Sequence, residues 1–114
     1  MSAQPKISLD PMYQLLRDEN VQEFNALRAK GVAADMRGVD LRGLDLRNLN
    51  ADGLDFTDAY FRGADLRGID FRKAKLEGVS FNSANVSGCY FPKDLRPEEV
   101  LASISHGLRV RYNS

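Results

Sequence analysis

The chain of 114 residues is poor in the side chains that most often build covalent or catalytic sites. It has one cysteine, Cys89, and one histidine, His106. A single cysteine excludes a disulfide within the chain, and these two residues alone cannot form a zinc site. We therefore assign no catalytic, cofactor-binding or metal-binding residues.

Long hydrophobic runs are also missing. No stretch approaches the length of about 20 apolar residues that a transmembrane helix needs. Residues 1–9 contain Pro5 and no apolar run, so nothing here resembles a signal peptide. These absences favour a cytoplasmic protein and predict no membrane partner.

Net charge is absent as well, because 16 basic and 16 acidic residues cancel. The balance also holds locally: residues 1–33 have four of each sign, residues 34–93 nine and residues 94–114 three. We expect no uniform attraction to nucleic acid or to an anionic membrane, and no acidic surface that imitates DNA. A charged patch on one face remains compatible with this composition.

What the chain does have is a five-residue repeat, present twelve times without a break over residues 34–93. Each repeat has a large apolar centre, small only at Ala51, and a second apolar residue two positions earlier. A period of five fits neither a helix, in which the apolar pair would rotate around all faces, nor a straight strand, in which it would change sides. The chain must therefore bend once per repeat to keep the pair inward.

Turn-forming residues stand where that bend is needed, two positions after the centre. They are Gly38, Gly43, Asn48, Gly53, Asp58, Gly63, Gly68, Gly78, Ser83 and Gly88, with only Lys73 and Lys93 departing. Repetition, an inward pair and a regular bend together predict a solenoid.

The repeat resembles the pentapeptide repeat family, whose motif A-(D/N)-L-x-x occurs here as Ala64-Asp65-Leu66-Arg67-Gly68. The resemblance covers about half the chain. It implies a bacterial protein and an all-β solenoid: a right-handed, quadrilateral parallel β-helix with four repeats per coil and hence three coils. Residues twenty apart should then stack in four columns: Met36/Phe56/Leu76, Leu41/Phe61/Phe81, Leu46/Leu66/Val86 and Ala51/Phe71/Phe91.

The flanking segments are expected to cap a single domain, because a solenoid exposes unpaired edges at both ends. We expect a flexible tail over residues 1–9, a helical N-terminal cap over 10–31, the β-helix over 32–93, and a C-terminal helix and tail over 94–114. Helix starts are indicated at Asp10-Pro11, at Asn20 and at Pro97. Gly107 is expected to end the last helix near His106, whose charge would complement the helix dipole.

The outward positions of the first two coils alternate aspartate and arginine. One interpretation is a solvated ladder in which each Asp neutralises the Arg two residues later. The other is an interaction surface, because stacking places Arg42 over Arg62 and Arg47 over Arg67, beside the outward Tyr60. The candidate interaction residues are Arg42, Arg47, Tyr60, Arg62 and Arg67.

The third coil lacks this ladder, which suggests either a covered end or neutral variation of solvated positions. Tyr90 is expected to pack beneath the terminal helix. Residues 108–112 alternate apolar and basic, so they predict a strand that covers the last coil or pairs with a second copy. The candidate dimer or cap contacts are Tyr90, Leu108, Val110 and Tyr112.

Enzymatic function finds little support, because a solenoid offers flat, convex faces rather than a site of converging titratable groups. Cys89 stands at an inward position, where a small buried hydrophobe is expected. We expect a non-enzymatic module for protein interaction or scaffolding. Two alternatives stay open: a DNA mimic that binds gyrase or topoisomerase, as the acidic, dimeric quinolone-resistance members of the resembled family do, and a structural homo-oligomer.

Overall fold

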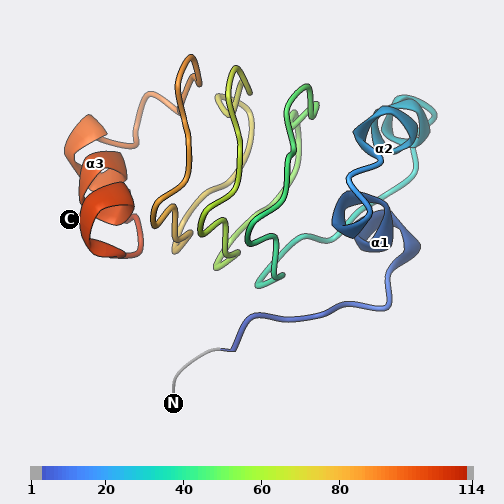
Figure 1. The fold of residues 1–114 in the computed structure, drawn as a ribbon. Helices are drawn as coiled ribbons and strands as arrows, with labels where there is room; N and C mark the ends of the chain where they lie inside the picture. The colour runs from blue at the N-terminus through green and yellow to red at the C-terminus, as the bar shows by residue number, and fades with distance from the viewer. Residues whose placement is uncertain (1–3, 113–114) are drawn as a thin grey trace.

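Three helices flank a coiled central segment in the computed structural model, which describes residues 4–112. Helices α1 (Pro11–Arg17) and α2 (Val21–Ala29) lie at one end of the coils, and α3 (Pro97–His106) lies at the other (Figure 1). We call residues 34–53, 54–73 and 74–93 the first, second and third coils. Residues 1–3 of the expected tail and 113–114 of the expected C-terminal cap lie outside the described residues.

The coils stack in a twenty-residue register. Parallel bridges join Asp40 to Tyr60, Tyr60 to Ser80 and Asp45 to Asp65, and three further bridges keep the same offset. Between coils, the backbone N–H of Leu41 donates to the carbonyl of Tyr60 at 2.9 Å. Four five-residue repeats therefore complete one turn of the chain, and adjacent turns are joined by hydrogen bonds.

The structure differs from the expected all-β solenoid in the length of its extended segments. Among the described residues the regular elements are three helices and isolated bridges, without a continuous strand or sheet. The reason is the bend in every repeat, which limits each extended segment to a residue or two before the chain turns.

The bends adopt the conformation that their residue types predict. All ten predicted turn residues have positive φ angles, between 59° and 79°, whereas Lys73 and Lys93 do not. Left-handed backbone suits glycine and is tolerated by asparagine and aspartate. Ser83, at φ 59°, is the least favoured residue type among them.

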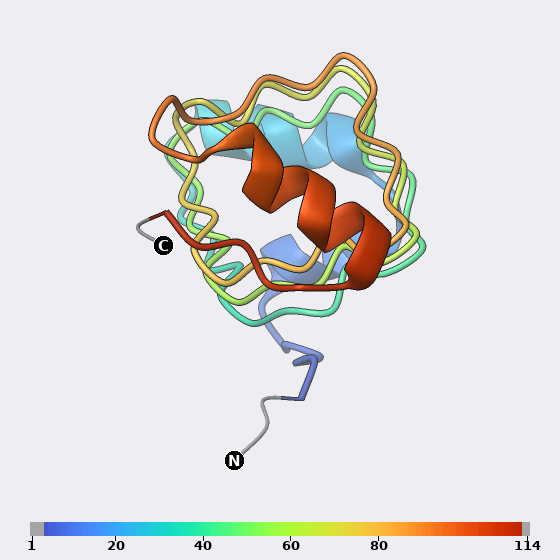
Figure 2. The ribbon, with the colours of Figure 1, turned by 90° about the vertical axis from the view of Figure 1, so that its left-hand side faces the viewer.

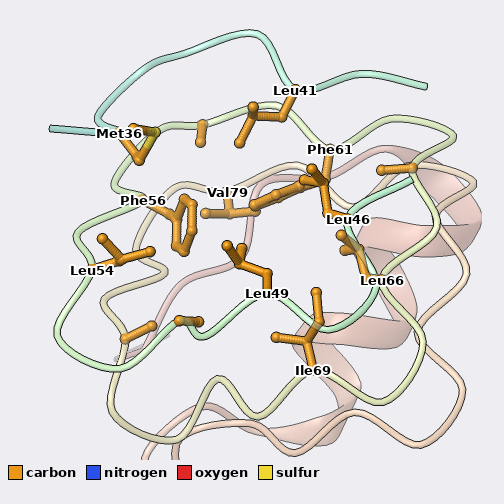
Figure 3. Packing of buried hydrophobic residues seen from close by; sticks show 14 of the residues in the cluster. Met36, Leu41, Leu46, Leu49, Leu54, Phe56, Phe61, Leu66, Ile69 and Val79 are labelled. Carbon is orange, nitrogen blue, oxygen red and sulfur yellow. The ribbon is translucent and has the colours of Figure 1, made fainter. Parts of the chain in front are cut away.

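The hydrophobic core fills the interior of the coils (Figure 3). The predicted columns are confirmed most directly by two ring stacks, Phe61 on Phe81 at 5.6 Å between centroids and Phe71 on Phe91 at 5.8 Å. The column residues are fully or almost fully buried, except that Val86 and Phe91 in the third coil are only partly buried. The core is thus dense in the middle and partly open at its C-terminal end.

Helices α1 and α2 begin as their sequences indicate. The Asp10 carboxylate accepts the Met12 amide at 2.9 Å with Pro11 at the first helical position, and the Asn20 side chain accepts the Glu23 amide at 3.3 Å. Both helices pack on the core through buried residues, among them Tyr13 and Phe24.

The expected flexible tail is tied to the first coil where the structure describes it. Lys6 forms a parallel bridge with Val39; its amide donates to the Gly38 carbonyl at 2.8 Å, and its carbonyl accepts the Asp40 amide at 2.9 Å. The first coil has an unpaired edge, and the backbone N–H and C=O groups of this edge form hydrogen bonds with the N-terminal segment.

At the other end, α3 crosses the opening of the last coil (Figure 2). It begins at Pro97 and ends at His106, and the following Gly107 has a left-handed φ of 72°. The tail then pairs with the third coil: Arg109 bridges Ser80 in antiparallel orientation, and the Gly78 amide donates to the Val110 carbonyl at 2.9 Å. The backbone of this tail is therefore engaged within its own chain.

Candidate interaction surface on the outer faces

The aspartate–arginine ladder is built within single repeats. In five of them the Asp carboxylate pairs with the arginine two residues later, with Nη2–Oδ2 distances of 2.7–2.9 Å. The same carboxylate accepts the arginine's backbone amide, so each aspartate also stabilises the local turn. The pairs are Asp35/Arg37, Asp40/Arg42, Asp45/Arg47, Asp65/Arg67 and Asp70/Arg72.

These hydrogen bonds stabilise the ionised carboxylates. The Arg37 side chain lowers the pKa of Asp35 to about 2, and Arg47 and Arg72 do the same for the pKa of Asp45 and of Asp70. The ladder therefore stays charged but locally neutral, as expected for a solvated surface.

Three of the eight repeats in the first two coils lack the pair, and one of these three has the arginine without the aspartate. Tyr60 occupies the position of the aspartate in residues 59–63, so Arg62 has no carboxylate in its own repeat. No ion pair joins Arg62 to any residue between 4 and 112. Tyr60 is engaged elsewhere: the guanidinium of Arg109 lies 4.9 Å over its ring and donates to its hydroxyl. Arg62 is thus an exposed arginine left uncompensated in a chain of zero net charge.

Arg62 shares a pocket of about 520 Å³ with two further arginines; the lining residues are Arg17, Asp40, Arg42, Gly43, Arg62 and Gly63. Arg17, in the last turn of α1, donates through Nη1 to the Asp40 carbonyl at 3.3 Å. Three guanidinium groups against one carboxylate give the lining a net charge of +2. We call this the arginine pocket.

The other two candidate arginines lie in a different environment. Arg47 and Arg67 pair with Asp45 and Asp65, and Arg47 Nε also lies 3.5 Å from Asp65. They line a separate pocket of about 770 Å³ with residues of α2 and the α1–α2 turn, among them Glu19. The expected edge of four guanidinium groups is therefore divided into a cationic pocket and a neutral network.

The four candidate contacts at the C-terminal end fall into two groups, buried cap contacts and exposed residues. Val110 is fully buried, and the Tyr112 hydroxyl accepts the Leu76 amide at 3.1 Å, so both are cap contacts. Leu108 stays exposed. Tyr90 does not pack beneath α3 as predicted: it is 59% exposed, with the guanidinium of Arg72 lying 4.7 Å over its ring. The ring thus contacts an arginine of the neighbouring coil and lines a pocket with residues of α3.

Cys89 and His106 lie in different environments. Cys89 is half-buried rather than fully buried; its Sγ donates to the Leu66 carbonyl at 2.9 Å, and burial raises the pKa of its thiol. His106 is exposed at the end of α3. Within residues 4–112 no three His, Cys, Asp or Glu side chains converge as metal ligands, and no helix in that range is long and apolar enough to cross a membrane.

A coiled core with a twenty-residue register, capped at both ends and decorated by charged side chains, defines a solenoid repeat protein with its chemistry on the outer faces. A family model for pentapeptide repeats matches the chain in 8 copies, over residues 32–61 and 55–91. The chain belongs to the pentapeptide repeat family, which implies a β-helix solenoid and in general a module for protein interaction or scaffolding. No curated protein and no solved structure matches the chain.

Proposed function

We propose that this protein is a non-enzymatic interaction module that binds an acidic surface of a partner protein. The contact surface is the arginine face, defined as the outward residues of segments 39–43, 59–63 and 79–83 together with Arg17 and Arg109. We also infer the right-handed, quadrilateral coil that pentapeptide repeats imply, with one repeat on each side of the square.

The observation that carries the proposal is an excess of positive charge on this face. Arg17, Arg42 and Arg62 are opposed there by Asp40, which gives a net charge of +2. Arg109 is compensated by Asp58, whose Oδ1 lies 3.7 Å from its Nη1. On the next face, segments 44–48, 64–68 and 84–88 carry two aspartates and two arginines and are neutral. A charged face on a neutral protein steers one class of partner without attracting polyanions in general.

The composition of the arginine face supports a protein partner. Tyrosine and arginine are the residue types most enriched where binding energy concentrates in protein interfaces. Here Tyr60 and Arg109 are half-buried and Arg62 is exposed, and the ring of Tyr60 is held by the cation–π contact with Arg109. An aromatic ring fixed before binding loses little conformational freedom on binding.

The contacts weigh against a gyrase-binding DNA mimic. Such a surface needs rows of uncompensated acids, but five aspartates of this chain are paired with arginines in their own repeats.

Self-association is the second candidate function, because an apolar pocket of about 520 Å³ lies between α3 and the third coil. Tyr90 and Leu101 line it and are exposed. Light scattering of the wild type and Leu101→Glu tests it: a dimer that the variant converts to monomer supports self-association.

The experiment for the main proposal is affinity capture from the source organism's lysate, followed by mass spectrometry. The test variant is Arg62→Glu, and the control is Lys73→Glu, which makes the same charge change at an exposed lysine of another face. Arg42 is left intact because its removal would strip the largely buried Asp40 of its ion pair. A partner retained by the control and lost by Arg62→Glu supports the proposal; equal capture by both variants contradicts it.

A further inference from the structure

We propose that the arginine pocket binds a phosphate group carried on a serine or threonine side chain of the partner. This inference rests on the proposed function and names the chemistry that the pocket recognises. It extends the expected interaction surface by Arg17, which α1 contributes from outside the repeats.

The first argument is charge. The pocket lining holds three guanidinium groups and the carboxylate of Asp40, a net charge of +2. Hydrogen bonds from Arg42 lower the pKa of Asp40, so this carboxylate remains ionised and the value of +2 holds at neutral pH. A phosphorylated side chain has a charge of about −1.5 to −2 at pH 7, whereas a glutamate supplies only −1. A phosphate monoester therefore matches the pocket, and a carboxylate leaves half of its charge uncompensated.

The second argument is the set of donors left free. Asp40 takes Nε and Nη2 of Arg42, each at 2.8 Å, so Nη1 of Arg42 remains. Among residues 4–112, Arg17 donates only through Nη1, toward the Asp40 carbonyl. The guanidinium of Arg62 has no hydrogen-bond partner within residues 4–112 and keeps its five N–H groups. Donors from two coils and one helix can meet the three oxygens of a tetrahedral phosphate, whereas a planar carboxylate has two.

The third argument concerns which polyanion fits. Nucleic acids and anionic membranes are held by rows or clusters of basic residues spread over an extended surface. This chain has zero net charge, and the network of Arg47 and Arg67 beside the pocket is neutralised by Asp45 and Asp65. One localised, open cationic pocket suits one phosphate group on a peptide, which is how arginine clusters recognise phosphorylated motifs.

Nuclear magnetic resonance titration of the full ¹⁵N-labelled chain tests the proposal, because glycine amides report on different faces. Gly43 and Gly63 line the pocket, whereas Gly53 and Gly88 lie on other faces. The probes are a short peptide with a central phosphoserine, the same peptide with glutamate or serine, and inorganic phosphate. We expect the phosphoserine peptide to shift Gly43 and Gly63 and to bind at least about tenfold tighter than the glutamate peptide.

Arg62→Ala and Arg17→Ala are each expected to weaken phosphopeptide binding about tenfold or more, because each removes a charged donor. The control Lys73→Ala is expected to change nothing. Equal binding of the glutamate peptide, or unchanged affinity in Arg62→Ala, overturns the phosphate site. Inorganic phosphate or vesicles of anionic lipid that bind as tightly as the phosphopeptide overturn the assignment to a protein side chain.

Treating the lysate with phosphatase before capture separates this inference from the proposed function. Loss of the Arg62-dependent partner after treatment supports the phosphate site. Retention of that partner overturns the phosphate site and leaves the interaction module in place, recognising carboxylates.

Discussion

Phe61→Ala tests the stacked core most severely. Phe61 is fully buried in the second coil, where its ring contacts Phe56, Phe71 and Phe81 at centroid distances of 5.2, 6.2 and 5.6 Å. Truncating a buried phenylalanine typically costs about 3–5 kcal/mol, through lost burial and the cavity left behind. Phe56 belongs to the preceding repeat, Phe71 to the repeat two further on and Phe81 to the next coil, so the cavity would weaken contacts both within a coil and between coils. We expect a loss in the upper half of that range.

Phe91→Ala is the matched control. It removes the same ring from the same repeat position, but Phe91 is only partly buried at the open end of the core. The partial burial predicts a loss of roughly half as much or less, about 1–2 kcal/mol. Urea unfolding at 25 °C, followed by circular dichroism, measures both values. Equal losses for the two variants, or a smaller loss for Phe61→Ala, would refute the account of a core that is dense in the second coil and partly open at its C-terminal end.

Three further predictions concern stability. The pKa of Asp45 and that of Asp70 are about 2 in the folded chain and about 3.9 in the unfolded chain. Their contribution to the stability of the fold is therefore present above pH 4 and is lost as pH falls from about 4 to 2. Thermal unfolding at constant ionic strength should show a flat Tm from pH 7 to 4 and a decline below pH 4. Val110→Ala should cost about 1.5–3 kcal/mol because the side chain is fully buried, and a midpoint that depends on protein concentration would contradict its role within one chain. Ser83→Gly should stabilise the fold by up to about 1 kcal/mol, since glycine adopts φ 59° more readily, and a lower unfolding midpoint would oppose the bend assignment.

Much of the fold could be predicted because its information is local and repeated. Five-residue spacing fixes which residues point inward, and the resemblance supplies four repeats per coil; together they place Phe61 on Phe81 and Phe71 on Phe91. The helix ends at Pro97 and Gly107 follow from residue types with strong backbone preferences. The Asp–Arg pairs two residues apart follow from the repeat as well.

The arginine pocket could be predicted only in part. The twenty-residue register places Arg42 beside Arg62. Tyr60 stands where other repeats have an aspartate, which indicates that Arg62 has no carboxylate partner in its own repeat. Arg17 could not be placed, because the packing of α1 against the first coil depends on long-range contacts, such as the Tyr13 hydroxyl donating to the Asp40 carbonyl. Tyr90 was misplaced because the position of α3 over the third coil depends on long-range packing; its ring instead lies under the guanidinium of Arg72 in the preceding coil.

The most direct test of the central claim is the amide spectrum of the ¹⁵N-labelled chain with the captured partner added. The glycines form a built-in map, with Gly43 and Gly63 on the arginine face, Gly68 and Gly88 on the neutral face beside it and Gly53 on the face after that. We predict that Gly43 and Gly63 shift or broaden while the other three stay in place, and that Arg62→Glu abolishes the change. Perturbation centred on Gly68 and Gly88 with Gly43 and Gly63 unmoved would contradict the proposed contact surface.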